Sequence, residues 1–88
     1  MIATGCVVRS NCGRDKGRFF VVVRIDGGFL FLADGKLHKL SSPKKKNASH
    51  VSATKTMLHA QQTRTDKQLR KALFPFNYGE FGILEDRD

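Results

Sequence analysis

The sequence predicts a mainly β fold, a small five-stranded barrel followed by one short C-terminal α-helix. Three observations favour it. Short apolar and β-branched runs with strand alternation fill the first half of the chain, and turns containing glycine separate them. Helical spacing is found only near residue 70. Because the chain has 88 residues, we expect one modest core and little room for a deep catalytic cleft.

The first strand leads into a turn rich in glycine and charge. Residues 2–8 are small or β-branched, and they predict a strand that ends near Arg9. Residues 10–17 then predict an ordered hairpin loop, because Gly13 and Gly17 can each take positive φ at little cost. Glycines at these positions would also let the backbone approach a ligand closely.

The second strand, residues 18–25, divides its side chains between two faces. We expect the core face to carry Phe19, Val21, Val23 and Ile25. The other face carries Arg18, Phe20, Val22 and Arg24. Because the middle of this second face is apolar, Phe20 and Val22 are expected either to lie under another element or to form an exposed patch.

Three further short strands are expected to complete the sheet. The turn at residues 26–28 is a strong hairpin signal, and residues 29–33 follow it as the third strand. The Asp34-Gly35 pair repeats the signal ahead of a fourth strand at 37–40, and residues 50–53 predict the fifth. The rest of the expected core is Val7 or Val8, Leu30 or Phe31, and Leu37.

The chain changes character after the barrel, which we assign to residues 1–54 with a basic arm at about residues 41–49. Residues 55–64 are polar and are expected to form a linker. The last unit, residues 65–88, combines a short helix with a tail that is aromatic and ends acidic. For this tail the sequence predicts no particular structure.

The helix is predicted from a capping signal and an apolar stripe. Thr65 fits the N-cap, and Gln68 stands three positions later as in a capping box. Pro75 discourages a regular helix much beyond Leu73. The stripe consists of Leu69, Ala72, Leu73 and Phe76. Since so short a helix is not stable alone, we expect its stripe to dock on the Phe20 and Val22 face.

The charge of the chain favours a polyanionic partner. Lysine and arginine number 16 against eight acidic residues, which gives a formal net charge of +8. Nucleic acid is favoured over a membrane surface, because no purely apolar run, residues 19–23 included, is longer than five residues. Charge alone does not separate RNA from DNA.

Other classes of function have little support in the sequence. The first residues lack the basic start and long apolar stretch of a secretion signal, so we expect a cytoplasmic protein with Cys6 and Cys12 reduced. Three histidines and two cysteines lack the close paired spacing of a zinc site. No phosphate-binding loop or nucleophile elbow is found either. We therefore expect no enzyme, no metal, no cofactor and no small-molecule substrate.

The positive charge is concentrated in two places. No acidic residue lies between Gly35 and Thr65, a stretch that contains Lys36, Lys39, Lys44, Lys45, Lys46, Lys55 and Arg64. Three adjacent lysines at 44–46 suit phosphate groups, although a solvated loop is the alternative. The turn adds Arg14, Lys16 and Arg18, for which a plain structural hairpin is the alternative.

Residues 4–35, "TGCVVRSNCGRDKGRFFVVVRIDGGFLFLADG", resemble the KOW motif of ribosomal and transcription-elongation proteins, in which a strand, a glycine turn and an alternating strand follow one another. Gly17 matches the motif's hallmark glycine. The following "GKLHKLSSPKKKNASHVSAT" is similar to the basic continuation in KOW-type large-subunit ribosomal proteins of archaea and eukaryotes and in small RNA-binding proteins of Gram-positive bacteria. "TDKQLRKAL" resembles the C-terminal helix of the bacterial group.

The resemblance implies an SH3-like barrel that binds structured RNA, in particular ribosomal RNA of the large subunit, without catalysis. The residues expected to bind RNA are Arg14, Lys16, Gly17, Arg18, Lys39, Lys44, Lys45, Lys46, Asn47 and His50. His50 is also compatible with a structural role. The tail from Phe74 to Asp88 departs from the lysine-rich ending of the family. The alternative is a protein-interaction adaptor that uses the Phe20 and Val22 patch or this aromatic tail.

Overall fold

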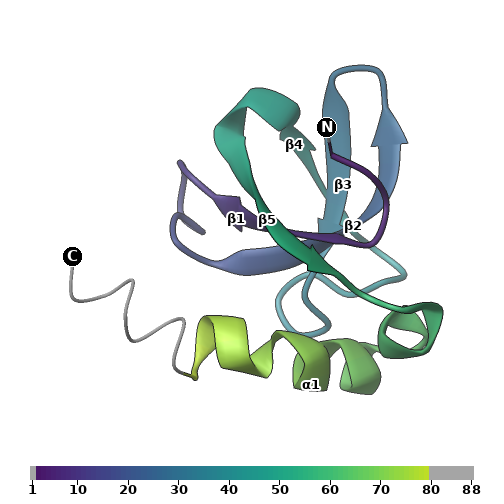
Figure 1. Cartoon of the computed structure of the whole chain (residues 1–88). Coiled ribbons are helices and arrows are strands. Elements are labelled where there is room, and N and C mark those ends of the chain that lie inside the picture. Colours follow the sequence, from purple (N-terminus) through teal and green to yellow (C-terminus); the bar gives the residue numbers. More distant parts are fainter. Residues whose placement is uncertain (1, 80–88) are drawn as a thin grey trace.

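The computed structural model describes residues 2–79 as one curved antiparallel sheet with a helix packed against it (Figure 1). The strands are β1 (Cys6–Ser10), β2 (Phe19–Asp26), β3 (Phe29–Ala33), β4 (Lys44–Asn47) and β5 (Val51–Met57). Two 3₁₀ turns, η1 (Ala48–His50) and η2 (Ala60–Thr63), precede and follow β5, and α1 (Asp66–Asn77) comes last. The mainly β class and the C-terminal helix are confirmed.

The strand order is β4-β3-β2-β1-β5, and every neighbouring pair is antiparallel. The sheet is open, since β4 and β5 are its two ends within residues 2–79. The hairpin at Gly27 and Gly28 joins β2 to β3 as predicted, and β3 has the predicted bounds. Gly13 and Gly17 have φ of +86° and +89°, so the turn before β2 uses the backbone freedom expected of it.

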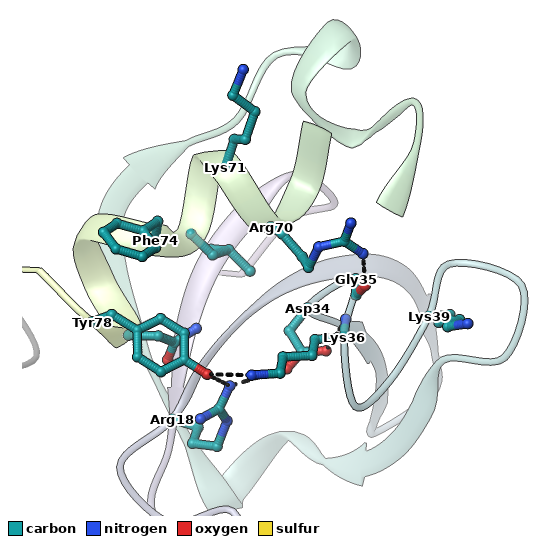
Figure 2. Close-up of a pocket in the computed structure, with 11 residues that line it drawn as sticks. Arg18, Asp34, Gly35, Lys36, Lys39, Arg70, Lys71, Phe74 and Tyr78 are labelled. Atoms are coloured by element: carbon teal, nitrogen blue, oxygen red, sulfur yellow. Dashed lines mark hydrogen bonds and ion pairs between the residues drawn. The ribbon is translucent and has the colours of Figure 1, made fainter. Parts of the chain in front are cut away.

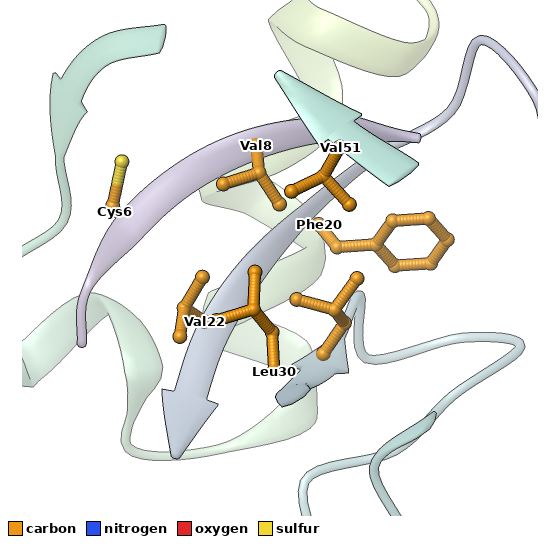
Figure 3. Packing of buried hydrophobic residues seen from close by; sticks show 7 residues of the cluster. Cys6, Val8, Phe20, Val22, Leu30 and Val51 are labelled. Atoms are coloured by element: carbon orange, nitrogen blue, oxygen red, sulfur yellow. The ribbon is translucent and has the colours of Figure 1, made fainter. Parts of the chain in front are cut away.

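Each face of the sheet contributes to a separate core cluster. On the inner, concave face, Phe20 and Val22 pack with Val8, Leu30 and neighbouring side chains, and Figure 3 shows these groups converging between the strands. On the outer face, Phe19 and Val21 of β2 join the stripe of α1. The members of this outer cluster are Val7, Phe19, Val21, Ala33, Leu69, Leu73 and Phe76.

The expected docking of the helix on Phe20 and Val22 is therefore wrong. These two side chains are 0% and 1% exposed inside the curved sheet, and α1 covers the face of Phe19 and Val21 instead. Alternation separates the two faces of a strand but does not say which one the sheet curls around, and in β2 both are covered. The apolar patch proposed for an adaptor consequently does not exist on the surface.

A bulge in β2 corrects a second core assignment. Val22 pairs with Leu32, but Arg24 pairs with Phe31, so the register shifts by one residue between them. Ile25 therefore lies opposite Leu30 and leaves the face of Val21, and it is 40% exposed. A bulge reverses which side of the sheet the following side chains occupy, and simple alternation does not reveal it.

The segment expected to be the fourth strand is a loop. Residues 37–40 form no ladder, and Leu37 is 61% exposed rather than part of the core. Asp34 explains this, because its Oδ1 accepts hydrogen bonds from the amides of Lys36 at 3.0 Å and His38 at 2.9 Å. A carboxylate that satisfies local amides replaces a strand partner.

The fourth strand is formed instead by the lysine run, which pairs with β3 so that Lys45 lies opposite Phe31. The basic arm expected at about residues 41–49 is thus mostly β4 and η1. Residues 55–57, expected to begin a linker, continue β5. Cys6 in β1 is buried and Cys12 in the turn is partly exposed, and both are free thiols.

Helix α1 begins as predicted and ends later. The Thr65 hydroxyl accepts a hydrogen bond from the Gln68 amide at 3.1 Å, which confirms the N-cap. The helix passes through Pro75 and continues to Asn77, so the expected end near Leu73 is wrong. Asn77 holds the extra turn: its Oδ1 accepts from the Phe19 amide at 2.8 Å, and its Nδ2 donates to the Phe19 carbonyl at 3.2 Å.

Candidate functional site

Asp15, in the turn before β2, organises three polar side chains. Its Oδ1 accepts hydrogen bonds from the Ser10 hydroxyl and from Nζ of Lys46, both at 2.8 Å, and its Oδ2 accepts from Nζ of Lys44 at 2.8 Å. Lys46 also donates to the carbonyl of Cys12 at 2.8 Å. The turn and β4 are therefore joined by a buried ion pair.

The charges around Asp15 change how it titrates. Burial of the carboxyl group opposes its ionisation, but the hydrogen bonds from Lys44, Lys46 and Ser10 outweigh burial and hold the pKa of Asp15 well below its ordinary value. Asp15 is therefore an anion at neutral pH. Its charge is neutralised inside the protein, and so is that of Lys46, whose side chain is only 7% exposed.

The lysine run consequently does not act as one free arm. Lys46 points inward and Lys44 is paired with Asp15, so Lys45 is the one exposed lysine of the three. The predicted residues Asn47 and His50 lie at the corner between β4 and β5. There Oδ1 of Asn47 caps η1 by accepting from the Ser49 amide at 2.9 Å, while His50 is exposed.

A second concentration of positive charge lies elsewhere, in a groove of about 680 Å³ between α1 and the loop after β3 (Figure 2). We call it the basic groove. Its cationic lining consists of Arg18, Lys36, Lys39, Arg70 and Lys71. Two aromatic rings, Phe74 and Tyr78, share the groove and are 58% and 48% exposed. Among residues 2–79, Asp34 is the one acidic residue that lines the groove.

Gly35 lets the two walls of the basic groove approach each other. Its φ is +80°, and a Cβ atom added there would overlap the carbonyl oxygen of Asp66 in the first turn of α1. Nη1 of Arg70 donates to the carbonyl of Gly35 at 2.7 Å, and Oδ1 of Asp66 accepts from the amide of Leu40 at 2.8 Å. The loop is thereby fixed against the helix.

Tyr78 lies among cations at one end of the groove. Its hydroxyl oxygen is 3.4 Å from Nη2 of Arg18 and 3.4 Å from Nζ of Lys36, and both cations also lie near the ring, 5.7 and 5.4 Å from its centroid (Figure 2). These two hydrogen bonds outweigh the opposing effect of burial and lower the pKa of the Tyr78 phenol. An anion placed here would meet the same two cations.

An ion pair with Asp34 fixes the position of the Arg18 side chain. Its Nη2 lies 3.3 Å from Oδ2 of this buried carboxylate. Burial of the guanidinium opposes its charge, but hydrogen bonds to Tyr78 and Asp34 prevail and raise the pKa of Arg18 above its ordinary value. The arginine is thus a fixed cation, and its Nε has no acceptor among residues 2–79.

The residues that the sequence predicted to bind RNA lie in different parts of the structure. Arg18 and Lys39 line the basic groove, whereas Arg14 and Lys16 are exposed on the turn beside Gly17. Sequence reasoning did not include the other groove residues among the site residues: Lys36, Arg70, Lys71, Phe74 and Tyr78. A signal for three of them was present, because Lys71, Phe74 and Tyr78 follow the i, i+3, i+7 spacing of one helix face beside the buried stripe.

Two features bear on other classes of site. Within residues 2–79, no group of three or more His, Cys, Asp and Glu side chains is arranged to hold a metal ion. In the same part of the chain, the helices are too short or too polar to cross a bilayer.

Comparison with known proteins adds no assignment. No protein-family model matches the chain, and a search of curated proteins found no match.

Proposed function

We propose that this protein is a non-catalytic RNA-binding protein that holds a structured RNA in the basic groove. The observation that carries the proposal is the groove's lining of five cations and two exposed aromatic rings. Cations along a groove neutralise a phosphate backbone, and exposed rings stack with any unpaired base. The net charge of +8 over the chain favours the same partner.

The fold supports the SH3-like KOW barrel that the sequence resembles. Five short antiparallel strands curve around the inner cluster, and the glycine turn with Gly17 leads into β2 as in the KOW motif. Ribosomal RNA of the large subunit is the RNA that the resemblance implies. We propose this class of RNA as the partner and the cytoplasm as its place of action.

The proposed RNA contacts lie mainly in the groove rather than along the lysine run. Lys36, Lys39 and Lys71 are exposed and offer charge to a ligand, whereas the charge of Lys46 is satisfied by Asp15. Among the predicted residues, Arg14 and Lys16 remain candidates for outlying phosphate contacts, since both are exposed. Recognition by such contacts depends on the shape of the RNA more than on its sequence.

The test is the salt dependence of RNA affinity in two matched triple variants. The groove variant carries Lys36→Ala, Lys39→Ala and Lys71→Ala. The control removes the same charge at exposed positions outside the groove, with Lys55→Ala, Arg64→Ala and Lys67→Ala. We expect the groove variant to reduce the slope of log K against log salt by about 2 to 3, roughly one for each phosphate that is no longer neutralised. The control should change it much less.

Equal slopes in the two variants would contradict the groove as the RNA site. The ribosomal assignment has its own test, which is sedimentation of the tagged protein with ribosomal subunits at low and high salt, with and without ribonuclease. Co-migration with the large subunit that high salt or ribonuclease removes is the expected result. Failure to co-migrate at low salt would leave RNA binding to be judged by the slopes alone and would reject the ribosome as partner.

A further inference from the structure

A second surface on the sheet combines cations with aromatic rings. The register places Arg24 of β2 opposite Phe31 of β3, and Phe31 opposite Lys45 of β4. Side chains of directly paired residues share one face of the sheet, so these three form a row across three strands. Phe29 stands two residues before Phe31 on the same face. We call these four residues the cation–aromatic row.

A cationic side chain lies over each aromatic ring in the row. Cζ of Arg24 lies 4.0 Å from the centroid of the Phe31 ring, and Nζ of Lys45 lies 4.4 Å from that of Phe29. Both distances are well within the range of cation–π attraction. Arg24 and Lys45 are exposed, and Phe29 is 40% exposed. The attraction therefore holds the cations in defined positions at the surface.

The bulge in β2 creates this arrangement. Without the shift between Val22 and Arg24, residue 23 would face Phe31 and Arg24 would lie on the opposite side of the sheet. The row makes no contribution to the basic groove, and its residues belong to neither buried cluster. The bulge thus brings Arg24 over the ring of Phe31. Packing of the two core clusters does not require this contact, because neither residue belongs to them.

We propose that the cation–aromatic row binds an unpaired stretch of RNA, with one base stacked on the guanidinium of Arg24 and the adjacent phosphate held by Lys45. Unpaired bases stack on arginine planes as well as on aromatic rings. This inference rests on the proposed function and makes it more specific: the RNA carries a single-stranded segment next to the helix held in the groove. Duplex RNA alone offers no free base to this surface.

The experiment compares two RNAs and three proteins. One RNA is a blunt-ended duplex, and the other is the same duplex with a single-stranded tail that contains the fluorescent base 2-aminopurine. The proteins are the wild type, a row variant with Arg24→Lys and Phe29→Leu, and the groove variant described above. Arg24→Lys keeps the charge but removes the planar group, and Phe29→Leu keeps an apolar side chain. Thermal melting of each variant checks that it folds.

The wild type is expected to bind the tailed duplex about tenfold more tightly than the blunt one, as the stacking of one base predicts, and to quench 2-aminopurine. The row variant should lose this preference and the quenching while binding the blunt duplex normally. The groove variant should bind both RNAs more weakly.

Each of the other outcomes has a definite meaning. A row variant that retains the tail preference and the quenching overturns the row as a base-stacking site, even if the groove variant has lost affinity for both RNAs. If the wild type binds neither RNA, the proposed function and this inference both fail. If Arg24→Lys and Phe29→Leu together prevent folding, Arg24→Lys alone provides the same comparison, because it leaves both rings in place.

Discussion

Nζ of Lys46 lies 2.8 Å from Oδ1 of Asp15, and both side chains are more than nine-tenths buried. Lys46 belongs to β4 and Asp15 to the turn between β1 and β2, so this pair connects two parts of the chain 31 residues apart. A buried charge pair contributes little net stability, but the loss of one partner leaves the other charge buried and alone.

Asp15→Asn is therefore expected to destabilise the fold by about 3 to 5 kcal/mol at neutral pH, the usual cost of stranding one member of a buried pair. Urea unfolding measures this cost. Asp26→Asn serves as the matched control, because Asp26 is exposed at the end of β2, and its effect should stay within about 0.5 kcal/mol. Adding Lys46→Met to Asp15→Asn should recover part of the loss. If Asp15→Asn loses less than about 1 kcal/mol, the ammonium group of Lys46 becomes hydrated in the variant and is not left buried without a partner.

The same pair predicts sensitivity to acid. The pKa of Asp15 is depressed in the folded protein, so its stabilising effect is complete above the pKa of the unfolded chain, near 4. It is lost as the pH falls below about 4, because the unfolded chain then binds a proton that the folded one does not. Unfolding free energy measured from pH 6 downward should fall more steeply for the wild type than for Asp15→Asn. Parallel curves would assign acid unfolding to other carboxylates.

Gly35→Ala is expected to weaken the docking of α1. Positive φ costs a residue with a side chain about 1 to 2 kcal/mol, and here the added methyl group would also overlap the carbonyl of Asp66. Gly27→Ala separates the two effects, since Gly27 has φ of +61° and open space around it. The Gly35 variant should be the less stable of the two, and amide hydrogen exchange should be faster in α1. Equal stability of the Gly35→Ala and Gly27→Ala variants would show that the loop after β3 can move away from Asp66 without loss of folding free energy.

Tyr78 reports directly on the basic groove because it is the only tyrosine in the chain. The ultraviolet absorbance of its phenolate should give a pKa below that of free tyrosine, and Lys36→Gln, which removes one of the two cations, should raise it. Bound RNA should raise it as well, since phosphates neutralise the same cations. Lys55→Gln is the control, as Lys55 lies outside the groove. A pKa that RNA leaves unchanged would place the ligand away from Tyr78.

Local signals in the sequence predicted local structure well. The glycine turns, the hairpin at Gly27 and Gly28, and the cap at Thr65 all involve residues within four positions of one another. The lysine run was predicted to be a basic arm rather than a strand, because it lacks apolar alternation. Asp15, 29 and 31 residues earlier in the chain, supplies the charge that lets Lys44 and Lys46 enter a strand.

The candidate site was harder to predict, since it depends on which face of the sheet α1 covers. Arg18 and Lys39 were identified by their charge, but Lys71 and Phe74 become groove residues only when the helix stripe meets Phe19 and Val21. The bulge that places Arg24 over Phe31 is likewise a property of strand pairing. Neither arrangement can be derived from alternation within one segment.

The two hydrogen bonds between Asn77 and the backbone of Phe19 join positions 58 residues apart. At a synthesis rate of about 5 to 20 residues per second, roughly 3 to 12 s separate the appearance of these two residues in the growing chain. During that interval the side chains that α1 will cover, Val7, Phe19 and Val21 among them, have no cover from the helix. The outer face of the sheet therefore gains its cover last, because the helix that packs on it is the last described element of the chain.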